Sequence, residues 1–227
     1  MTLSKRTVLG ISLAVIVLSW LYQIAAQRSG PALPSQFSEL VLRVVREKLI
    51  VSVAIFVLLR LGGERFESLG VRRQDWRTHL GMGVVLGFAM FVGLNVAFSS
   101  VMNSLIPSSA ASAKSLAAFF KPPANLLIWL PIGIVGGGVV EEFQRIFVLT
   151  RFEKWLGRPG LIVGVTLTSA MFGFGHLYQG LGIAISTAVS GLAFAFVYLR
   201  RRSALEPVAA HAFSDVLAVL AATMLAR

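Results

Sequence analysis

The chain has 227 residues, of which 56% are hydrophobic and only 14% are charged, and its mean hydropathy of +0.79 predicts that lipid, rather than water, surrounds most of it. It contains no cysteine, which excludes disulfide frameworks, thiolate nucleophiles and cysteine-ligated zinc. The formal net charge is +11, but the cations lie between apolar segments rather than on one face, so they indicate membrane topology and no nucleic-acid partner.

The first apolar segment covers residues 7–26 and follows two basic residues, Lys5 and Arg6. It has the length and charge pattern of a secretory signal peptide, and Ala25-Ala26-Gln27 offers a possible cleavage site. Several further apolar segments follow, however, and proteins with many spans commonly retain such a helix. We therefore interpret it as the first transmembrane span.

Further segments are long enough to cross a hydrocarbon core of ~30 Å, which requires about 20 apolar residues. Glycine and proline pairs separate them, and no linker is long enough to mark a second domain. We predict an all-α, polytopic transmembrane helical bundle that forms one integral membrane domain over residues 1–227. The predicted spans after the first are 42–61, 78–103, 124–150, 160–178, 180–200 and 205–226.

Residues 37–49 mix five charged residues with leucines and valines, which is typical of an amphipathic helix. This segment either leads into the second span or forms a separate interfacial helix. The predicted number of membrane elements is therefore seven to eight.

The distribution of lysine and arginine between loops predicts a cytoplasmic N-terminus and an external C-terminus. One side of the membrane receives Lys5, Arg6, Arg60, Arg65, Arg72, Arg73, Arg77, Arg151, Lys154, Arg158, Arg200, Arg201 and Arg202. The other side receives Arg28, Arg43, Arg46, Lys48, Lys114, Lys121 and Arg227. An eighth span would reverse the side assigned to the C-terminus.

Few ionisable residues lie inside the predicted spans, and each of them is a candidate functional residue because a charge at mid-bilayer costs several kcal/mol unless it faces a partner or water. The fourth span contains Glu141, Glu142 and Arg145. His176 lies near the end of the fifth span, and His211 and Asp215 lie in the seventh. His79, at the start of the third span, is interpreted as an interfacial residue without a role.

The spacing of the first cluster leaves one carboxylate without a cation. On an ideal helix with about 100° per residue, Arg145 lies about 40° from Glu141 and about 60° from Glu142, so it can neutralise either. The remaining glutamate, buried without its own cation, suits general-base work on water. An ion-paired cluster that only joins helices would explain one glutamate and the arginine, but not the second glutamate.

His211 and Asp215 lie four residues apart, and thus on one face of a helix. This spacing lets the carboxylate fix the tautomer and the orientation of the imidazole. A histidine and an aspartate at this distance also occur as a simple packing contact. The combination with His176 and the glutamates is what favours a functional interpretation.

Three short patterns in this order resemble the CAAX prenyl protease and bacteriocin-processing family of intramembrane endopeptidases, which includes abortive-infection-like membrane proteins. The family pattern is Glu-Glu-x-x-x-Arg, then Phe-x-x-x-His, then His-x-x-x-Asn or Asp. This chain has Glu141-Glu142 with Arg145, Phe172 with His176, and His211 with Asp215. The resemblance covers about residues 124–220, which would form the catalytic core, and the run from Glu64 to Gly70 is similar to the family's loop before the third span.

The resemblance implies an intramembrane endopeptidase that hydrolyses a peptide bond of a membrane-associated protein or peptide, in an integral membrane location such as a bacterial inner membrane. Glu141, helped by His176, would activate water, Glu142 would pair with Arg145, and His211 with Asp215 would stabilise the oxyanion. Arg145 stands one residue earlier than in the family pattern, so the two glutamates can exchange roles. An ionised Asp215 cannot donate to an oxyanion, and we favour a role in which it orients His211.

Three alternatives remain open from the sequence. We assign no cofactor, but Glu141, His176 and His211 could together bind Zn²⁺ with water in the fourth position. The same residues could form the relay of a proton-coupled transporter, which would be expected to carry inverted repeats. A catalytically silent family member would act as a membrane scaffold or immunity factor.

The depths of the two histidines set a structural condition. With ~1.5 Å of rise per residue, straight helices would place His211 and His176 more than ~10 Å apart along the membrane normal. A common site therefore requires tilted helices or a break in the fifth span, which we expect at Gly173 and Gly175.

Overall fold

The structure is a computed structural model that describes residues 3–28, 36–71, 74–106 and 125–225. All regular elements in these ranges are helices, and no strand occurs in them. Predicted loop residues Arg72, Arg73, Lys114, Lys121 and Arg227 lie outside the described ranges, as does the Pro122-Pro123 pair.

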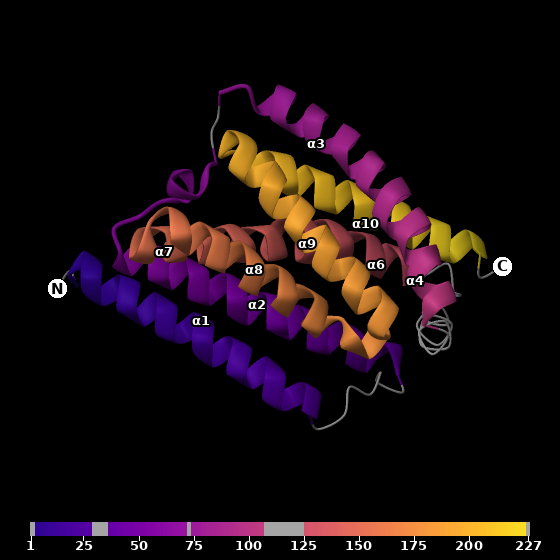
Figure 1. The fold of residues 1–227 in the computed structure, drawn as a ribbon, viewed down its shortest axis with the longest axis horizontal. Coiled ribbons are helices and arrows are strands. Elements are labelled where there is room, and N and C mark those ends of the chain that lie inside the picture. The colour runs from indigo at the N-terminus through magenta and orange to yellow at the C-terminus, as the bar shows by residue number, and fades with distance from the viewer. Residues whose placement is uncertain (1–2, 29–35, 72–73, 107–124, 226–227) are drawn as a thin grey trace.

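Within these ranges, seven long helical stretches follow one another, and Figure 1 shows their arrangement. Helices α1 (Lys5–Arg28) and α2 (Phe37–Leu61) are followed by the 3₁₀ helix η1 (Phe66–Leu69). The next stretch comprises α3 (Trp76–Met90), η2 (Phe91–Phe98) and α4 (Ser99–Leu105), and the one after it α6 (Leu126–Pro131), η5 (Ile132–Glu141) and α7 (Glu142–Leu156). The chain ends with α8 (Arg158–Gly175), η6 (Leu177–Gln179), α9 (Leu181–Arg201) and α10 (Leu205–Leu225).

Two of these stretches contain a π-helical middle, η2 and η5. In η5 the wider turn follows Pro131, which has no backbone N–H, and includes Gly133 and the run Gly136 to Gly138. Because π-helical turns hold more residues than α-helical turns, directions calculated for an ideal α-helix do not apply to side chains inside them. Glu141 is the last residue of η5, whereas Glu142 is the first of α7.

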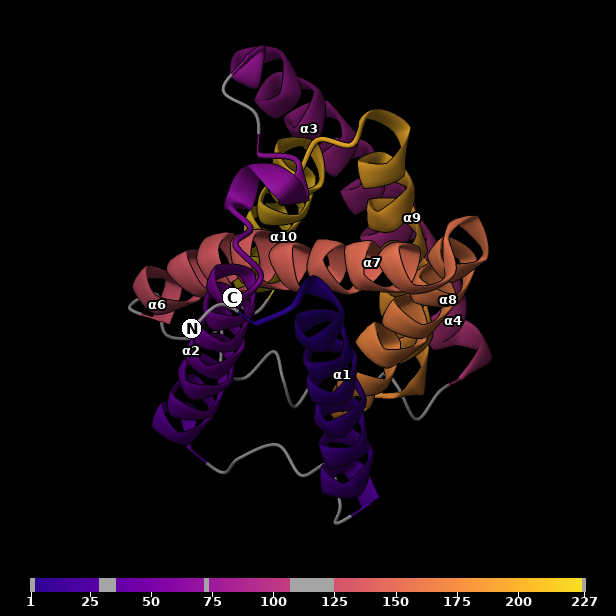
Figure 2. The same cartoon turned by 90° about the vertical axis from the view of Figure 1, so that its left-hand side faces the viewer.

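Helix α10 occupies the interior of the bundle, where it packs against α3 on one side and η5 on the other. Helix α8 packs against both α7 and α9. Figure 1 shows α1 and α2 along one edge and α3 along the opposite edge, and Figure 2 shows α1 and α2 extending together from beneath the long stretch of α6 and α7.

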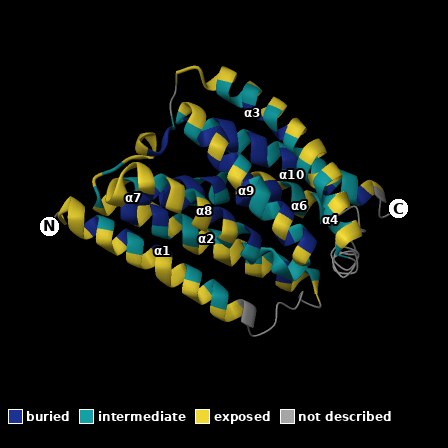
Figure 3. Ribbon diagram, in the orientation of Figure 1, coloured by how far each residue is buried: buried dark blue, intermediate teal, exposed yellow. Residues whose placement is uncertain are grey.

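Many large apolar side chains are exposed on the outside of the bundle, while several ionisable side chains are buried within it. Large apolar residues such as Leu18, Leu42 and Phe196 are exposed on the outside, while Glu142, Arg151 and Glu206 are buried inside. Figure 3 shows the exposed residues along the outer faces of α1, α2 and α3. An exterior with this much exposed apolar surface is stable in lipid and not in water, so the chain is an integral membrane protein.

Among the described residues, five helical stretches are long and apolar enough to cross a membrane: Lys5–Ala26, Trp76–Leu105, Leu126–Leu156, Leu181–Arg201 and Leu205–Met224. The all-helical, multi-span prediction is confirmed, but the predicted count of seven to eight spans is not. Helix α2 falls outside the five because it carries five charges in its first half, and α8 because it has only 18 residues and begins at Arg158.

The predicted amphipathic segment 37–49 is the first half of α2, which continues without a break to Leu61. Its outward residues, among them Arg43 and Arg46, are exposed, while Leu40 and Lys48 are turned toward the other helices. Among the described residues the segment therefore leads into the second helix and does not form a separate element.

Four segments that the charge pattern assigned to one side of the membrane meet at one end of the bundle. The backbone N–H of Ala204, before α10, donates to the carbonyl of Gly70, after η1, at 3.1 Å. Arg202 donates to both carboxylate oxygens of Glu153 on α7, at 2.6 and 2.8 Å. Gly62, at the end of α2, lies beside Val8 near the start of α1. We refer to this region as the basic end.

Candidate active site

Glu142 is held rigidly at the centre of the bundle. Its carboxylate is fully buried and accepts hydrogen bonds from Arg145 Nε at 3.1 Å, from Arg145 Nη2 at 3.2 Å and from His211 Nδ1 at 2.8 Å. These contacts join α7 to α10 and satisfy both carboxylate oxygens. Of the two glutamates that the sequence left open, Arg145 therefore pairs with Glu142.

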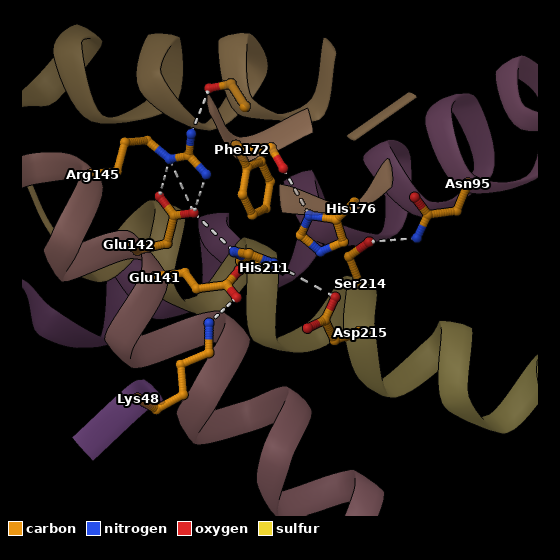
Figure 4. A network of polar contacts seen from close by, with 11 residues as sticks. Lys48, Asn95, Glu141, Glu142, Arg145, Phe172, His176, His211, Ser214 and Asp215 are labelled. Atoms are coloured by element: carbon orange, nitrogen blue, oxygen red, sulfur yellow. Dashed lines mark hydrogen bonds and ion pairs between the residues drawn. The ribbon is translucent and has the colours of Figure 1, made fainter. Parts of the chain in front are cut away.

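Arg145 is itself enclosed by neighbouring groups (Figure 4). Its guanidinium lies 4.5 Å from the centroid of the Phe172 ring and 5.7 Å from that of Phe194, and its Nη1 donates to the carbonyl of Gly191 at 3.3 Å. A side chain at Gly191 would begin only 3.0 Å from Nη1, so α9 needs a glycine there. Arginine cations between aromatic faces are well stabilised in a desolvated site, but this one has no room to move.

Glu141 points in a different direction and pairs with Lys48 of α2, whose ammonium donates to Oε1. Its other oxygen, Oε2, lies 3.8 Å from His211 Nε2. The Glu141 side chain keeps 17% of its surface exposed, whereas Glu142 keeps none. The prediction that one glutamate lacks a cation is therefore wrong. The cation is Lys48, 93 residues earlier in the chain, which local spacing could not reveal.

His211 of α10 lies between the two glutamates. While Nδ1 donates to Glu142, Nε2 faces Glu141 at 3.8 Å and Asp215 Oδ1 at 3.7 Å. The ring is stacked on Phe194, with centroids 4.4 Å apart and planes 16° from parallel. Both ring nitrogens thus face carboxylates, and only a protonated imidazole donates from both.

His176 reaches the same site from the end of α8. Its Nδ1 donates to the carbonyl of Phe172 at 2.8 Å, which leaves Nε2 as an acceptor in the neutral ring. The Phe172 ring contacts both histidines, with centroid distances of 4.9 Å to His176 and 5.8 Å to His211. A common site for the two histidines required tilted helices or a break near Gly173 and Gly175. The break is present, because α8 ends at Gly175, directly before His176.

Asp215 lies one turn after His211, and its side chain is 32% exposed. Glycines of η5 make room for it: a side chain at Gly133 would begin 3.1 Å from the Asp215 Cβ, and one at Gly137 would clash with Oδ2. The close approach of α10 to η5 at Gly133 and Gly137 brings Asp215 toward Glu141. The described part of the chain thus gathers all six predicted site residues.

Sequence reasoning missed several residues of this site. Lys48 was counted on the external side of the membrane as part of the amphipathic segment 37–49, although its spacing of eight residues from Leu40 on an amphipathic helix indicated the inner face. Phe194 was also missed, and so was Asn95 of η2, whose Nδ2 donates to Ser214 Oγ at 3.2 Å. No local signal distinguished these two residues from ordinary packing residues.

The arrangement does not fit the zinc alternative. Among the described residues no group of three histidine, aspartate or glutamate side chains is placed to hold one metal ion. In addition, the ammonium of Lys48 occupies Glu141 Oε1, where it would repel a divalent cation. We therefore assign no step to a metal.

His79, predicted to have no role, forms part of a second buried cluster. Its Nδ1 lies 2.8 Å from Oε1 of the fully buried Glu206, which also accepts from Arg201 at 3.1 Å and from Arg200 at 3.4 Å. The interfacial interpretation missed this because the partners lie on α10 and on the last turn of α9. The cluster fixes the start of α10 against α3.

A third ion-paired group lies at Glu64, in the loop between α2 and η1. Burial alone would raise the pKa of Glu64, but hydrogen bonds and positive charge from Arg151 and Lys154 outweigh it and lower the pKa from 4.5 to about 2. Arg151 donates to Glu64 at 2.6 and 3.0 Å, and its side chain is almost fully buried. The loop whose sequence resembled the protease family is thus bound to α7.

Residues 123–217 match the model of one family, described as type II CAAX prenyl endopeptidase Rce1-like. The matched segment runs from just before α6 to α10 and contains all six predicted site residues. No curated protein and no solved structure matches the chain.

Proposed function

From the Rce1-like match of residues 123–217, which confirms the resemblance indicated by the three motifs, we propose that the chain is an intramembrane CAAX-type endopeptidase. It hydrolyses a peptide bond of a membrane-associated protein or peptide with water activated by Glu141. Residues 124–220 are the catalytic core within a single membrane domain. The observation that carries the proposal is the contrast between two adjacent glutamates, one saturated by hydrogen bonds and the other facing two histidines.

Glu141 is the general base because it keeps an oxygen available. Glu142 already accepts hydrogen bonds from Arg145 and His211 on both oxygens and has no exposed surface, so it cannot approach a water molecule. Glu141 uses Oε1 for Lys48 and directs Oε2 toward His211. A base must lie within hydrogen-bond reach of the proton that it removes, and only Glu141 has that freedom.

The two histidines take different parts. His176 donates from Nδ1 to its own helix, so its Nε2 accepts a hydrogen bond from the attacking water and directs the oxygen lone pair toward the carbonyl carbon. His211, protonated between three carboxylates, donates from Nε2 to the oxyanion of the tetrahedral intermediate. Asp215 holds the His211 ring in place, and Glu142 stabilises it from the other side.

The proposed topology has seven spans, a cytoplasmic N-terminus and the basic end at the cytoplasmic face. Only Gly157 separates α7 from α8, and only residues 176–180 separate α8 from α9. If α7 and α9 cross the bilayer, α8 must return between them. Figure 1 shows α1 beginning at one end of the bundle and α10 ending at the other, as expected for an odd number of spans.

The proposed partners are the lipid of a cell membrane, such as a bacterial inner membrane, and a peptide segment near its surface, with no nucleic acid. The apolar outer face of the helices supports the first, and the match to an endopeptidase family supports the second.

The test is cleavage of a library of lipid-anchored peptides by the purified chain in vesicles, with and without a chelator. Glu141→Gln should reduce kcat by at least about 10³-fold, since the step loses its base. His176→Ala should reduce kcat by about 10²-fold. Equal cleavage by wild type and both variants would refute the proposal.

A matched control is Glu47→Gln, which removes an exposed carboxylate from the same bundle and should leave cleavage unchanged. Loss of cleavage on addition of the chelator alone would replace the glutamate mechanism with a metal-dependent one.

A further inference from the structure

Lys48 is a cation that the three family-like motifs do not include. Lys48 lies in the first half of α2 and is turned toward the other helices, whereas Arg43 and Arg46 of the same helix are exposed. The alkyl chain of Lys48 lies against η5, where a side chain at Gly136 would begin 3.6 Å from Lys48 Cγ. The ammonium reaches Glu141, and 25% of the side chain is exposed.

The two permanent cations of the site differ in freedom. Arg145 is buried to 4% exposure and bound by Glu142, a backbone carbonyl and two aromatic rings, so it cannot reach a substrate. Lys48 has three N–H groups, and within the described residues Glu141 is its one hydrogen-bond partner. Its four-carbon stem rotates readily, so the ammonium can follow a charge that moves by a few ångströms.

Such a movement of charge occurs in the reaction proposed above. A lone pair of the water oxygen attacks the carbonyl carbon, one water proton passes to Glu141, and the carbonyl π electrons move onto oxygen. Glu141 becomes neutral as the oxyanion becomes negative, so the counterion of Lys48 disappears while a new anion forms beside it. When the C–N bond breaks, the proton on Glu141 passes to the leaving nitrogen and the resting ion pair returns.

Resting on that function, we propose that Lys48 is a catalytic residue that transfers its hydrogen bond from Glu141 to the oxyanion in the transition state. The oxyanion then has two donors, Lys48 Nζ and His211 Nε2. An ionised Asp215 can only accept, so it does not fill this place. A donor that meets charge only as it develops lowers the activation barrier without strengthening substrate binding.

A weaker role must be distinguished from this one. Lys48 could serve only to keep Glu141 ionised. The charged and titratable groups that act on Glu141 are Lys48 from α2, His176 and Tyr178 after α8, and His211 and Asp215 from α10. Removing the cation makes protonation of Glu141 easier, which moves the acid limb of the rate profile to higher pH in either case.

The experiment measures kcat and KM from pH 5 to 10 for wild type, Lys48→Met, Lys48→Gln and Lys48→Arg in vesicles. We expect the alkaline plateau of kcat to fall by about 10²- to 10³-fold in the Met and Gln variants, with KM changed less than threefold. Lys48→Arg should restore at least a tenth of the wild-type rate, because it retains a cationic donor. Arg46→Met, which removes an exposed cation from the same helix, should match wild type.

Recovery of the wild-type plateau at high pH in Lys48→Met and Lys48→Gln would overturn the proposal and leave Lys48 only as the partner of Glu141. Melting temperatures in detergent within about 3 °C of wild type are required of both variants. If both unfold, the Lys48→Arg rate decides: a kcat of at least one tenth of the wild-type value supports a donor, and a lower kcat contradicts it. Failure of wild type itself to cleave any peptide would count against the endopeptidase function and not against Lys48 alone.

Discussion

The carboxylates at the basic end and those in the candidate active site are both buried among cations, but they are paired to different extents. At the basic end, Glu64 accepts from Arg151 and Lys154, and Glu206 is bonded by three positively charged or titratable groups. In the active site, Arg145 is committed entirely to Glu142. Glu141 pairs with Lys48 and lies near His211, and Asp215 lies near His211.

The difference teaches how to separate structural from reactive charges in a membrane bundle. A carboxylate with every oxygen saturated is held in one position and serves to join helices. A carboxylate with a free oxygen beside an imidazole can exchange a proton without breaking the fold. The predictions below test this distinction, in order of decreasing effect.

Arg145→Met should have the largest effect, since it leaves the buried carboxylate of Glu142 without its cation. We expect a loss of stability of about 3–5 kcal/mol and no detectable cleavage. Thermal unfolding in detergent measures the first and peptide cleavage the second. Lys154→Met removes a cation whose side chain is 45% exposed from the same helix and should cost at most about 1 kcal/mol. Equal losses in the two variants would contradict the distinction.

Gly137→Ala should impair activity more than stability. The new methyl group would clash with Asp215 Oδ2 and begin 3.4 Å from His211 Nε2. Displacing these groups by about 1 Å should lower kcat by about 10²-fold. Gly136→Ala is the matched control, because its nearest neighbour would be Lys48 Cγ at an ordinary 3.6 Å. Similar kcat values for the two variants would show that the site tolerates displacement of Asp215.

Glu64→Gln should show the opposite behaviour, with reduced stability and retained activity. The pKa of Glu64 is lowered in the folded protein to about 2 from 4.5. Its carboxylate therefore stabilises the fold fully above pH 4.5, and this contribution disappears as the pH falls toward 2. We expect wild type to be more stable than the variant by about 2 kcal/mol at pH 7 and equally stable near pH 2. Melting curves against pH measure the difference, and a difference independent of pH would rule out this origin.

Asp215→Asn should have the smallest effect. If Asp215 only orients His211, an asparagine amide oxygen can do the same, and we expect kcat within about tenfold of wild type. Steady-state kinetics at pH 7 provides the measurement. A loss as large as that of Glu141→Gln would mean that the Asp215 charge itself takes part in the reaction.

The main features of the fold could be predicted from the sequence, because the length of an apolar segment and the glycine and proline residues at its ends determine where a helix begins and ends. All seven predicted segments correspond to helical stretches, including α8, which begins right after Gly157. The number of membrane spans could not be read in the same way. Whether α2 and α8 cross the bilayer depends on the partners of their charged residues and on their neighbours, not on their own composition.

The candidate site shows the same division. The sequence selected Glu141, Glu142, Arg145, His176, His211 and Asp215, because ionisable residues are rare in apolar helices and stand out there. Their catalytic roles remain predictions. Local spacing determined which residues share a face, such as His211 with Asp215.

Only the tertiary structure decided how these charges pair. Glu141, the last residue of η5, pairs with Lys48 of α2, while Glu142, the first residue of α7, pairs with Arg145 of the same helix and with His211 of α10. The packing of α2 against η5 then brings Lys48 to Glu141 across 93 residues of chain. Ion pairing in a desolvated interior depends on distances between separate helices, and no pattern within one helix encodes them.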